Sequence, residues 1–151
     1  MSHVAAVELE VSSLADLETA CKILGLTYLP NETDWRWFGK WMADYSDQNA
    51  AYKNGIAANR YGKADAGIIQ VPGAQYDVGV YKHPTKPGKF VLVYDNWNEG
   101  MGIERAIGKG LVKLKERYGA TVAKRTLTKQ GYRVIESTNK QTGRLVLRAV
   151  K

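Results

Sequence analysis

The sequence predicts one α+β domain over residues 1–151, with a single, mainly antiparallel sheet and two helices packed on one face of that sheet. Three observations lead to this prediction. Short segments of alternating apolar and polar residues precede residue 100, two segments repeat apolar residues at steps of three and four, and a glycine-containing turn joins two alternating segments near the C-terminal end. A chain of 151 residues and 16.8 kDa suits one domain with its own core.

The N-terminal segment, residues 3–11, predicts a half-buried strand. Its apolar side chains, Val7, Leu9 and Val11, fall on one side of an extended chain. The glutamates between them fall on the other side, where they meet solvent. This alternation is typical of an antiparallel strand with one covered face.

A first helix follows this strand and stops at Gly25. Ser12 or Ser13 caps its N-terminus, and Asp16 in the first turn favours the positive end of the helix dipole. Cys21 belongs to the apolar stripe of this helix and is expected in the core rather than as a reactive thiol. The full stripe is Leu14, Leu17, Cys21 and Leu24.

The middle of the chain contains the other strands of the predicted sheet. Leu26–Leu29 is a short strand, residues 43–61 are an exposed loop or a weak helix, and residues 62–70 lead into another strand. Tyr76–Tyr81 and Phe90–Trp97 form an antiparallel hairpin, because two prolines lie in their connection, where they remove no ladder hydrogen bond.

The most aromatic stretch of the chain follows the second strand. Read as a strand, it places Trp35, Trp37 and Trp41 on one face and Arg36 and Lys40 on the other. Three indoles on one face are too much apolar area for an idle surface. The stretch is therefore either a wall of the core or a platform on which bases stack while the two cations meet phosphates.

Residues 103–130 predict one long helix that ends at Gly131. Its apolar stripe, about 100° wide, consists of Ile103, Ile107, Leu111, Leu114, Tyr118 and Val122. Its polar side carries a basic row within about 80° on the same helical wheel, formed by Lys109, Lys113, Arg117 and Lys124. Arg125 adds a cation at the negative end of the helix dipole. One face of this helix is expected to be core and the other a basic surface.

A hairpin closes the chain, with strands Tyr132–Glu136 and Arg144–Val150 and a glycine in the turn between them. Alternation in the last strand places Leu145 and Leu147 inward. The residues expected to face outward are Arg144, Val146 and Arg148, which extend the basic surface of the helix.

The charge of the chain is divided unevenly along its length. Residues 105–151 contain 13 Lys and Arg but only two acidic residues, whereas the net charge of the whole chain is +7. These cations either form solvated faces or attract a polyanion such as nucleic acid, a nucleotide or an acidic protein surface. Charge alone does not decide among these interpretations.

The residue types that carry most enzyme chemistry are scarce. There are two histidines, without ligand spacing, and one cysteine, which excludes an intrachain disulfide and a multi-cysteine zinc site. We therefore predict no catalytic residue, no metal and no cofactor. One enzymatic alternative remains, in which neighbouring strands bring together two of the carboxylates Asp65, Asp77 and Asp95 for acid–base work or Mg²⁺ binding.

The sequence also gives an expectation about compartment. No apolar run approaches the roughly 18 residues of a membrane span, and the N-terminus lacks the basic start and apolar core of a secretory leader. A lone cysteine favours a reducing compartment. We expect a cytoplasmic protein without a membrane partner.

Short stretches along nearly the whole chain carry a family resemblance. They are Ser2-His3-Val4, Leu24-Gly25-Leu26, Gly62-Lys63-Ala64-Asp65, Tyr76-Asp77-Val78-Gly79, Val93-Tyr94-Asp95-Asn96-Trp97, Arg117-Tyr118, Lys129-Gln130-Gly131-Tyr132 and Gly143-Arg144-Leu145-Val146-Leu147. With these stretches in this order, the chain resembles a widespread family of unknown function. The family is encoded as a hypothetical reading frame in some plastid genomes and has relatives in cyanobacteria, other bacteria and phages. Bacterial relatives tend to be encoded near a ring-forming ATPase, so the resemblance implies an accessory role.

Three functions follow from these patterns. The first is a non-enzymatic binding module for an anionic partner, nucleic acid or a nucleotide. Its phosphate contacts come from Lys109, Lys113, Arg117, Lys124, Arg125, Arg144 and Arg148, and its stacking contacts from Trp35, Trp37 and Trp41. The second is an adaptor that docks on a partner protein, such as a ring-forming ATPase, or self-assembles. The third is a small carboxylate-dependent enzyme.

Overall fold

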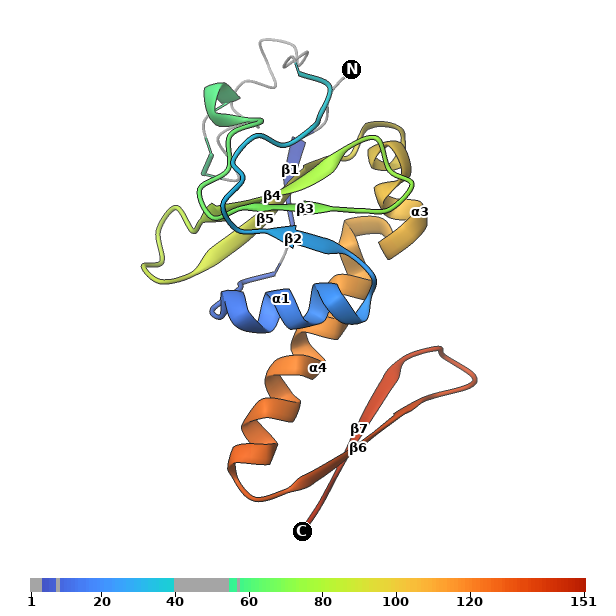
Figure 1. Ribbon diagram of the computed structural model, residues 1–151. Helices are drawn as coiled ribbons and strands as arrows, with labels where there is room; N and C mark the ends of the chain where they lie inside the picture. Colours follow the sequence, from blue (N-terminus) through green and yellow to red (C-terminus); the bar gives the residue numbers. More distant parts are fainter. Residues whose placement is uncertain (1–3, 8, 40–54, 57) are drawn as a thin grey trace.

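The computed structural model describes residues 4–7, 9–39, 55–56 and 58–151 and has the predicted α+β fold (Figure 1). Its main sheet is antiparallel throughout and has five strands in the spatial order β1-β5-β4-β3-β2. In chain order these strands are β1 (Val4–Ala6), β2 (Thr27–Leu29), β3 (Ile68–Gln70), β4 (Asp77–Lys82) and β5 (Phe90–Asp95). The helices are α1 (Leu14–Ile23), α3 (Ile103–Ile107) and α4 (Val112–Lys129), with 3₁₀ turns at Ala58–Arg60, Trp97–Gly102 and Lys109–Leu111.

The C-terminal hairpin forms a second sheet of its own, so the prediction of a single sheet is wrong at this point. Its strands are β6 (Arg133–Thr138) and β7 (Leu145–Val150), which pair with each other. Figure 1 shows the hairpin beside the far half of α4, away from the five-stranded sheet. Polar contacts join the hairpin to α4 instead, because Arg117 donates to Glu136 of β6 and the Leu145 amide donates to Glu116.

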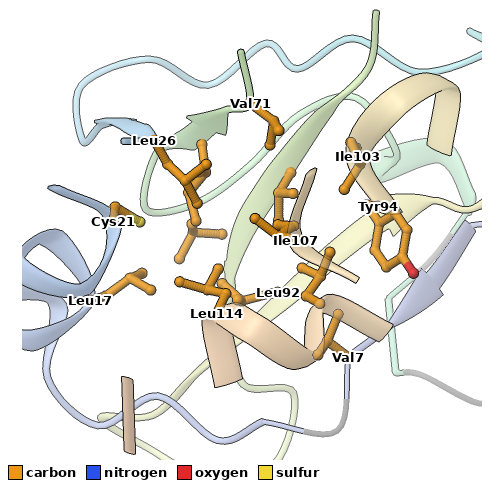
Figure 2. Close-up of a cluster of buried hydrophobic side chains, with 14 of the residues drawn as sticks. Val7, Leu17, Cys21, Leu26, Val71, Leu92, Tyr94, Ile103, Ile107 and Leu114 are labelled. Atoms are coloured by element: carbon orange, nitrogen blue, oxygen red, sulfur yellow. The ribbon is translucent and has the colours of Figure 1, made fainter. Parts of the chain in front are cut away.

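One face of the five-stranded sheet carries the helices, as predicted. Val78 and Val80 of β4 and Leu92 of β5 point toward α1 and α4, and all three are fully buried. Figure 2 shows side chains from both helices and from the sheet converging in this cluster. Burial of such large apolar side chains supplies the main stabilisation of the domain, at about 1.5–3 kcal/mol each. The helical members of the cluster are Leu17, Ala20, Cys21, Ile103, Ile107, Leu114 and Tyr118.

The opposite face of the sheet is covered by the described part of the aromatic stretch, residues 34–39, which is not a strand. Trp35 is 3% exposed, and its Nε1 donates a hydrogen bond of 2.8 Å to the hydroxyl of Tyr81 on β4. Gly79 makes room for the indole, since a Cβ at that position would lie 2.6 Å from Trp35 Nε1. Ile56 and Tyr61 complete this second apolar cluster. Of the two interpretations that the sequence allowed for Trp35, the structure supports the core wall.

Both predicted caps of α1 are present. The Ser13 hydroxyl accepts a hydrogen bond of 3.1 Å from the amide of Asp16, and Gly25 ends the helix with φ 75°. Cys21 is fully buried, as predicted, and this burial raises the pKa of its thiol to about 12. A thiol with that pKa is neutral at physiological pH and behaves as a small apolar side chain.

The predicted long helix is interrupted, which corrects the sequence interpretation. Helix α3 ends at Ile107, and Gly108 has φ 87° and ψ 159°, a conformation that only glycine adopts without strain. Gly110 and Leu111 also have positive φ, and α4 begins at Val112. The break keeps Leu111 fully buried but removes Lys109 from the helix that carries the other members of the basic row.

Two glycine substitutions distinguish this broken helix from a continuous one. Gly108→Ala is expected to lower the free energy of unfolding by about 2 kcal/mol, because alanine is strained at this φ and ψ and its Cβ would lie 2.5 Å from Val112 Cγ1. In a continuous helix the same change would be stabilising. Gly119 lies inside α4, and no atom lies within 4 Å of the Cβ that alanine would add. Gly119→Ala is therefore expected to raise the free energy of unfolding by about 0.5–1 kcal/mol. Urea denaturation of the two variants measures the sign of the change in the free energy of unfolding for each.

Candidate nucleic-acid interface

The C-terminal arm, defined as α4 together with the β6–β7 hairpin, contains most of the predicted anion-binding residues. The chain reverses at Gly131, with φ 90°, where the Tyr132 amide donates to the Leu127 carbonyl at 3.0 Å and the Gly131 amide to that of Thr128 at 3.1 Å. This pair of bonds is a Schellman cap. It confirms the predicted helix end and sends the hairpin back along α4.

The base of the arm is fixed to the domain by Tyr118, which is 4% exposed. Its hydroxyl accepts hydrogen bonds from the amides of Ser12 and Ser13, at 3.0 and 3.2 Å. These amides lie where the chain enters α1, so α4 is held against α1 by polar contacts as well as by the core. The orientation of the arm is therefore set by buried contacts.

Arg117 holds the hairpin to α4 and is not a free cation. Its Nη1 donates to Glu136 of β6, and its side chain is only 16% exposed. A second contact joins the same elements, since the Leu145 amide donates to Glu116 at 3.3 Å. The Nε of Arg117 is buried and has no hydrogen-bond partner among the described residues. The phosphate contact predicted for Arg117 is therefore replaced by a structural ion pair.

Arg125 is likewise engaged inside the molecule. Its Nη2 and Nε donate to the two carboxylate oxygens of Asp16 at 2.7 and 3.0 Å, and the Asp16 side chain is 7% exposed. These hydrogen bonds hold the pKa of Asp16 below its usual range. The pair joins α4 to the first turn of α1. Arg125, for which a phosphate contact was predicted, therefore has a carboxylate partner within the protein.

This ion pair makes the stability of the domain depend on pH. A folded-state pKa below the unfolded value means that Asp16 stabilises the fold above about pH 4 and loses this contribution as the pH falls through its folded pKa. Asp16→Asn is expected to lower the thermal midpoint at pH 7, with a difference from wild type that shrinks toward pH 3. Glu18→Gln on the same helix, which breaks only an exposed pair with Lys22, is the control with little effect. A difference in thermal midpoint between Asp16→Asn and the wild type that stays constant with pH would contradict a stabilising role of the charged Asp16–Arg125 pair.

The other predicted cations are exposed. Within the part of the chain that the structure describes, none of them takes part in an ion pair: Lys109, Lys113, Lys124, Arg144 and Arg148. The two acidic residues of the arm, Glu116 and Glu136, are both engaged with the arm itself. Within the described residues, the exposed cations of the arm thus form no ion pair, and the carboxylates that share the groove with Lys124 are already paired with Arg117 and Arg125.

The pairing register of the hairpin determines which side chains its outer face presents. Cross-strand partners share a face, and Glu136 and Leu147 form a pair on the side of α4. The alternate pairs lie on the outer face: Arg133 with Val150, Ile135 with Arg148, and Ser137 with Val146. The exposed positions predicted for Val146 and Arg148 are confirmed. Arg133, which was not among the predicted residues, also lies on this outer face, because its face depends on a register that the sequence does not specify.

A groove of about 320 Å³ lies between α1, α4 and the hairpin. Ile23 of α1, which is 54% exposed, and Leu147 of β7 supply apolar parts of its lining, and Lys124 supplies an exposed cation. Asp16, Arg117 and Arg125 also line this groove, but their charges are paired. The groove is thus a mixed apolar and basic surface.

The predicted stacking residues are separated from the arm. Trp35 and Trp37 contact each other with ring centroids 6.1 Å apart, and they belong to the cluster on the sheet face opposite the helices. Trp37 also meets Tyr61 edge to face. Trp41 lies outside the described residues. The structure does not bring Trp35 and Trp37 to the basic surface, and the burial of Trp35 leaves no ring face for a base.

The three carboxylates of the enzymatic alternative all have structural partners. Asp77 accepts hydrogen bonds from the backbone and guanidinium of Arg36 at 2.8–3.0 Å. Asp95 accepts from the amides of Phe38 and Trp97, and Asp65 from the amide of Lys82 and the guanidinium of Arg60. Asp77 and Asp95 thereby hold the aromatic stretch on the sheet. In the described residues, no group of three or more His, Cys, Asp or Glu could hold a metal ion.

A family model described as a protein of unknown function (DUF1257) matches residues 44–147. The chain belongs to this family. The match confirms the expected membership of an uncharacterised family. No curated protein and no solved structure matches the chain.

The matched range covers most of the arm. It includes all of α4 and β6 and ends within β7, so Arg148 follows its last residue. No helix in the described part of this DUF1257 chain is long and apolar enough to cross a membrane.

Proposed function

We propose that this DUF1257 protein is a non-enzymatic binding module for an anionic partner, and that this partner is nucleic acid held by the C-terminal arm. One observation carries the proposal. Both acidic residues of the arm are used in its own packing, while Lys113, Lys124 and Arg148 are exposed and take part in no ion pair in the described structure. Such an uncompensated positive field attracts polyanions.

The distribution of these cations favours an extended polyanion over a single nucleotide. Lys113 lies in the first turn of α4 and Lys129 at its last residue, so they are about 24 Å apart along the helix axis. Arg144 and Arg148 add two exposed cations on the hairpin. A mononucleotide is too small to meet charges over this span, whereas phosphates repeat along a nucleic-acid strand.

The test is binding of a fluorescently labelled oligonucleotide, followed by anisotropy, as the salt concentration rises from about 50 to about 200 mM. Three or four phosphate contacts predict a log–log slope of about −3 and a loss of affinity of about 50-fold over this range. ATP at equal phosphate concentration should compete poorly. A salt-independent affinity, or no binding at the lowest salt, would refute the proposal.

A second candidate function, an adaptor for a protein partner, is favoured by exposed apolar side chains on α1 and on the hairpin. Ile23, which lines the groove, is 54% exposed, and Val146, on the outer face of the hairpin, is 44% exposed. A partner protein would bury them, and the complex would survive high salt. Ile23→Asp would then abolish the complex, whereas it should leave oligonucleotide binding nearly unchanged.

A further inference from the structure

The β6–β7 hairpin is a two-stranded ribbon with one face free. Among the described residues, no third strand pairs with it. Its inner face lies toward α4 and carries Leu145 and Leu147, which are half-buried. Arg148, on the other face of β7, is exposed. Figure 1 shows the ribbon at the end of the molecule, clear of the five-stranded sheet. A ribbon in this position can enter a groove without a clash from the main sheet.

The chemistry of the outer face suits the edges of DNA bases. Its cross-strand pairs contribute two guanidinium groups, from Arg133 and Arg148, and one hydroxyl, from Ser137. Arginine binds guanine O6 and N7 through two hydrogen bonds, and valine or another methyl-bearing side chain such as Val146 can contact the methyl group of thymine. The hairpin's single acidic residue, Glu136, lies on the inner face against Arg117, so no carboxylate on this face repels a phosphate.

The dimensions of the ribbon select the form of the nucleic acid. Six paired residues per strand span about 20 Å, and paired strands lie about 4.8 Å apart. The major groove of B-DNA, about 12 Å wide, admits a two-stranded ribbon. The major groove of A-form RNA is too deep and narrow for side chains to read, and a single strand has no groove.

Cations at both ends of the ribbon are placed to meet phosphates. Lys140 lies in the turn and Arg144 directly before β7, and both are exposed. Lys151 follows the other end, with its Nζ 5.0 Å from the ring centroid of Tyr132. Phosphate contacts at the two ends would fix the register of the ribbon, while Arg133 and Arg148 reach the bases between them.

We infer that the nucleic acid bound by the arm is a B-form DNA duplex, whose major groove receives the outer face of the β6–β7 ribbon. This inference rests on the proposed function and names its substrate class. Arg133 and Arg148 are the residues that contact base edges. Lys140, Arg144 and Lys151 contact the backbone on either side.

The first experiment compares three ligands of the same base sequence: duplex DNA, duplex RNA and single-stranded DNA. Anisotropy titrations at one salt concentration are expected to show duplex DNA bound at least about tenfold more tightly than either of the others. Methyl green, which occupies the major groove, should displace the protein, whereas netropsin, which occupies the minor groove, should not. Equal affinity for all three ligands would overturn the inference while leaving the proposed function in place. No binding to any of them at low salt would overturn both.

The second experiment replaces a guanidinium without changing charge. Arg148→Lys keeps the positive charge but cannot form the paired hydrogen bonds of arginine, so duplex DNA affinity should fall about tenfold with the same salt slope. The matched control is Arg105→Lys, an exposed arginine on α3 outside the arm. Affinity for single-stranded DNA should not change in either variant, and unchanged thermal midpoints verify folding. Equal duplex affinity for wild type and Arg148→Lys would contradict the base contact.

Discussion

The double variant Lys140→Glu with Arg144→Glu is expected to bind duplex DNA about 100-fold more weakly than the wild type at about 100 mM salt. Both side chains are exposed and take part in no ion pair in the described structure, so the reversal disturbs no internal contact. One phosphate contact is worth roughly eightfold in affinity at this salt concentration, and repulsion by the new carboxylates adds to the loss. Anisotropy titrations measure the affinity, and the salt slope should become shallower by about two.

The control for this variant changes the net charge equally at another place. Lys63→Glu with Lys82→Glu alters two exposed lysines in or next to the main sheet. Among the described residues, the only ion pair lost is the exposed contact between Lys63 and Asp34. Its affinity should fall by less than about threefold, through the long-range field alone. Equal losses in the two double variants would show that net charge, and not the arm, determines binding.

Leu114→Ala is expected to lower the free energy of unfolding by about 3 kcal/mol, the typical cost of removing a buried leucine side chain. Leu114 is fully buried where α4 crosses the sheet, between both helices and β5. Urea denaturation should show an earlier midpoint with an unchanged slope. Because this side chain holds the base of the arm, its loss should also weaken DNA binding near the unfolding transition.

Val112→Ala, two residues earlier in α4, is the matched control. Val112 is 52% exposed, so its truncation should change the free energy of unfolding by about 0.5 kcal/mol or less. In an uninterrupted helix, Val112 would still be exposed and Leu114 would still be buried. These two variants therefore test the burial of Leu114 and not the break between α3 and α4. A cost for Leu114→Ala below about 1 kcal/mol would contradict the observed packing of α4 on the sheet.

The caps and buried stripes were predictable from the sequence because their causes are local. Gly25 and Gly131 end their helices through hydrogen bonds among residues within one turn, and a spacing of three and four residues places Leu114 and Tyr118 on one face in any helix. The break at Gly108 was not predicted. The apolar spacing continues across it, and a glycine inside a helical pattern is compatible with either outcome.

The corrections at the candidate site have long-range causes. Arg125 lies 109 residues from Asp16 in sequence, and helical periodicity says nothing about such a partner. Arg117 was taken for a surface cation because the hairpin that covers it was expected in the main sheet. Trp35 faces the core because Gly79 of β4 leaves space for its indole, which is a property of the register between distant segments. The exposure of Lys113 and Lys124, by contrast, followed from the helical wheel.

The most direct test of the arm as the interface is lysine footprinting. The folded protein is acetylated with a water-soluble reagent, with and without saturating duplex DNA, and the modification of each lysine is measured by mass spectrometry. Protection is predicted at Lys140 and Lys151, while Lys63 and Lys82, which are exposed outside the arm, keep their reactivity. Protection of Lys63 and Lys82 with unchanged labelling of the arm would contradict the account.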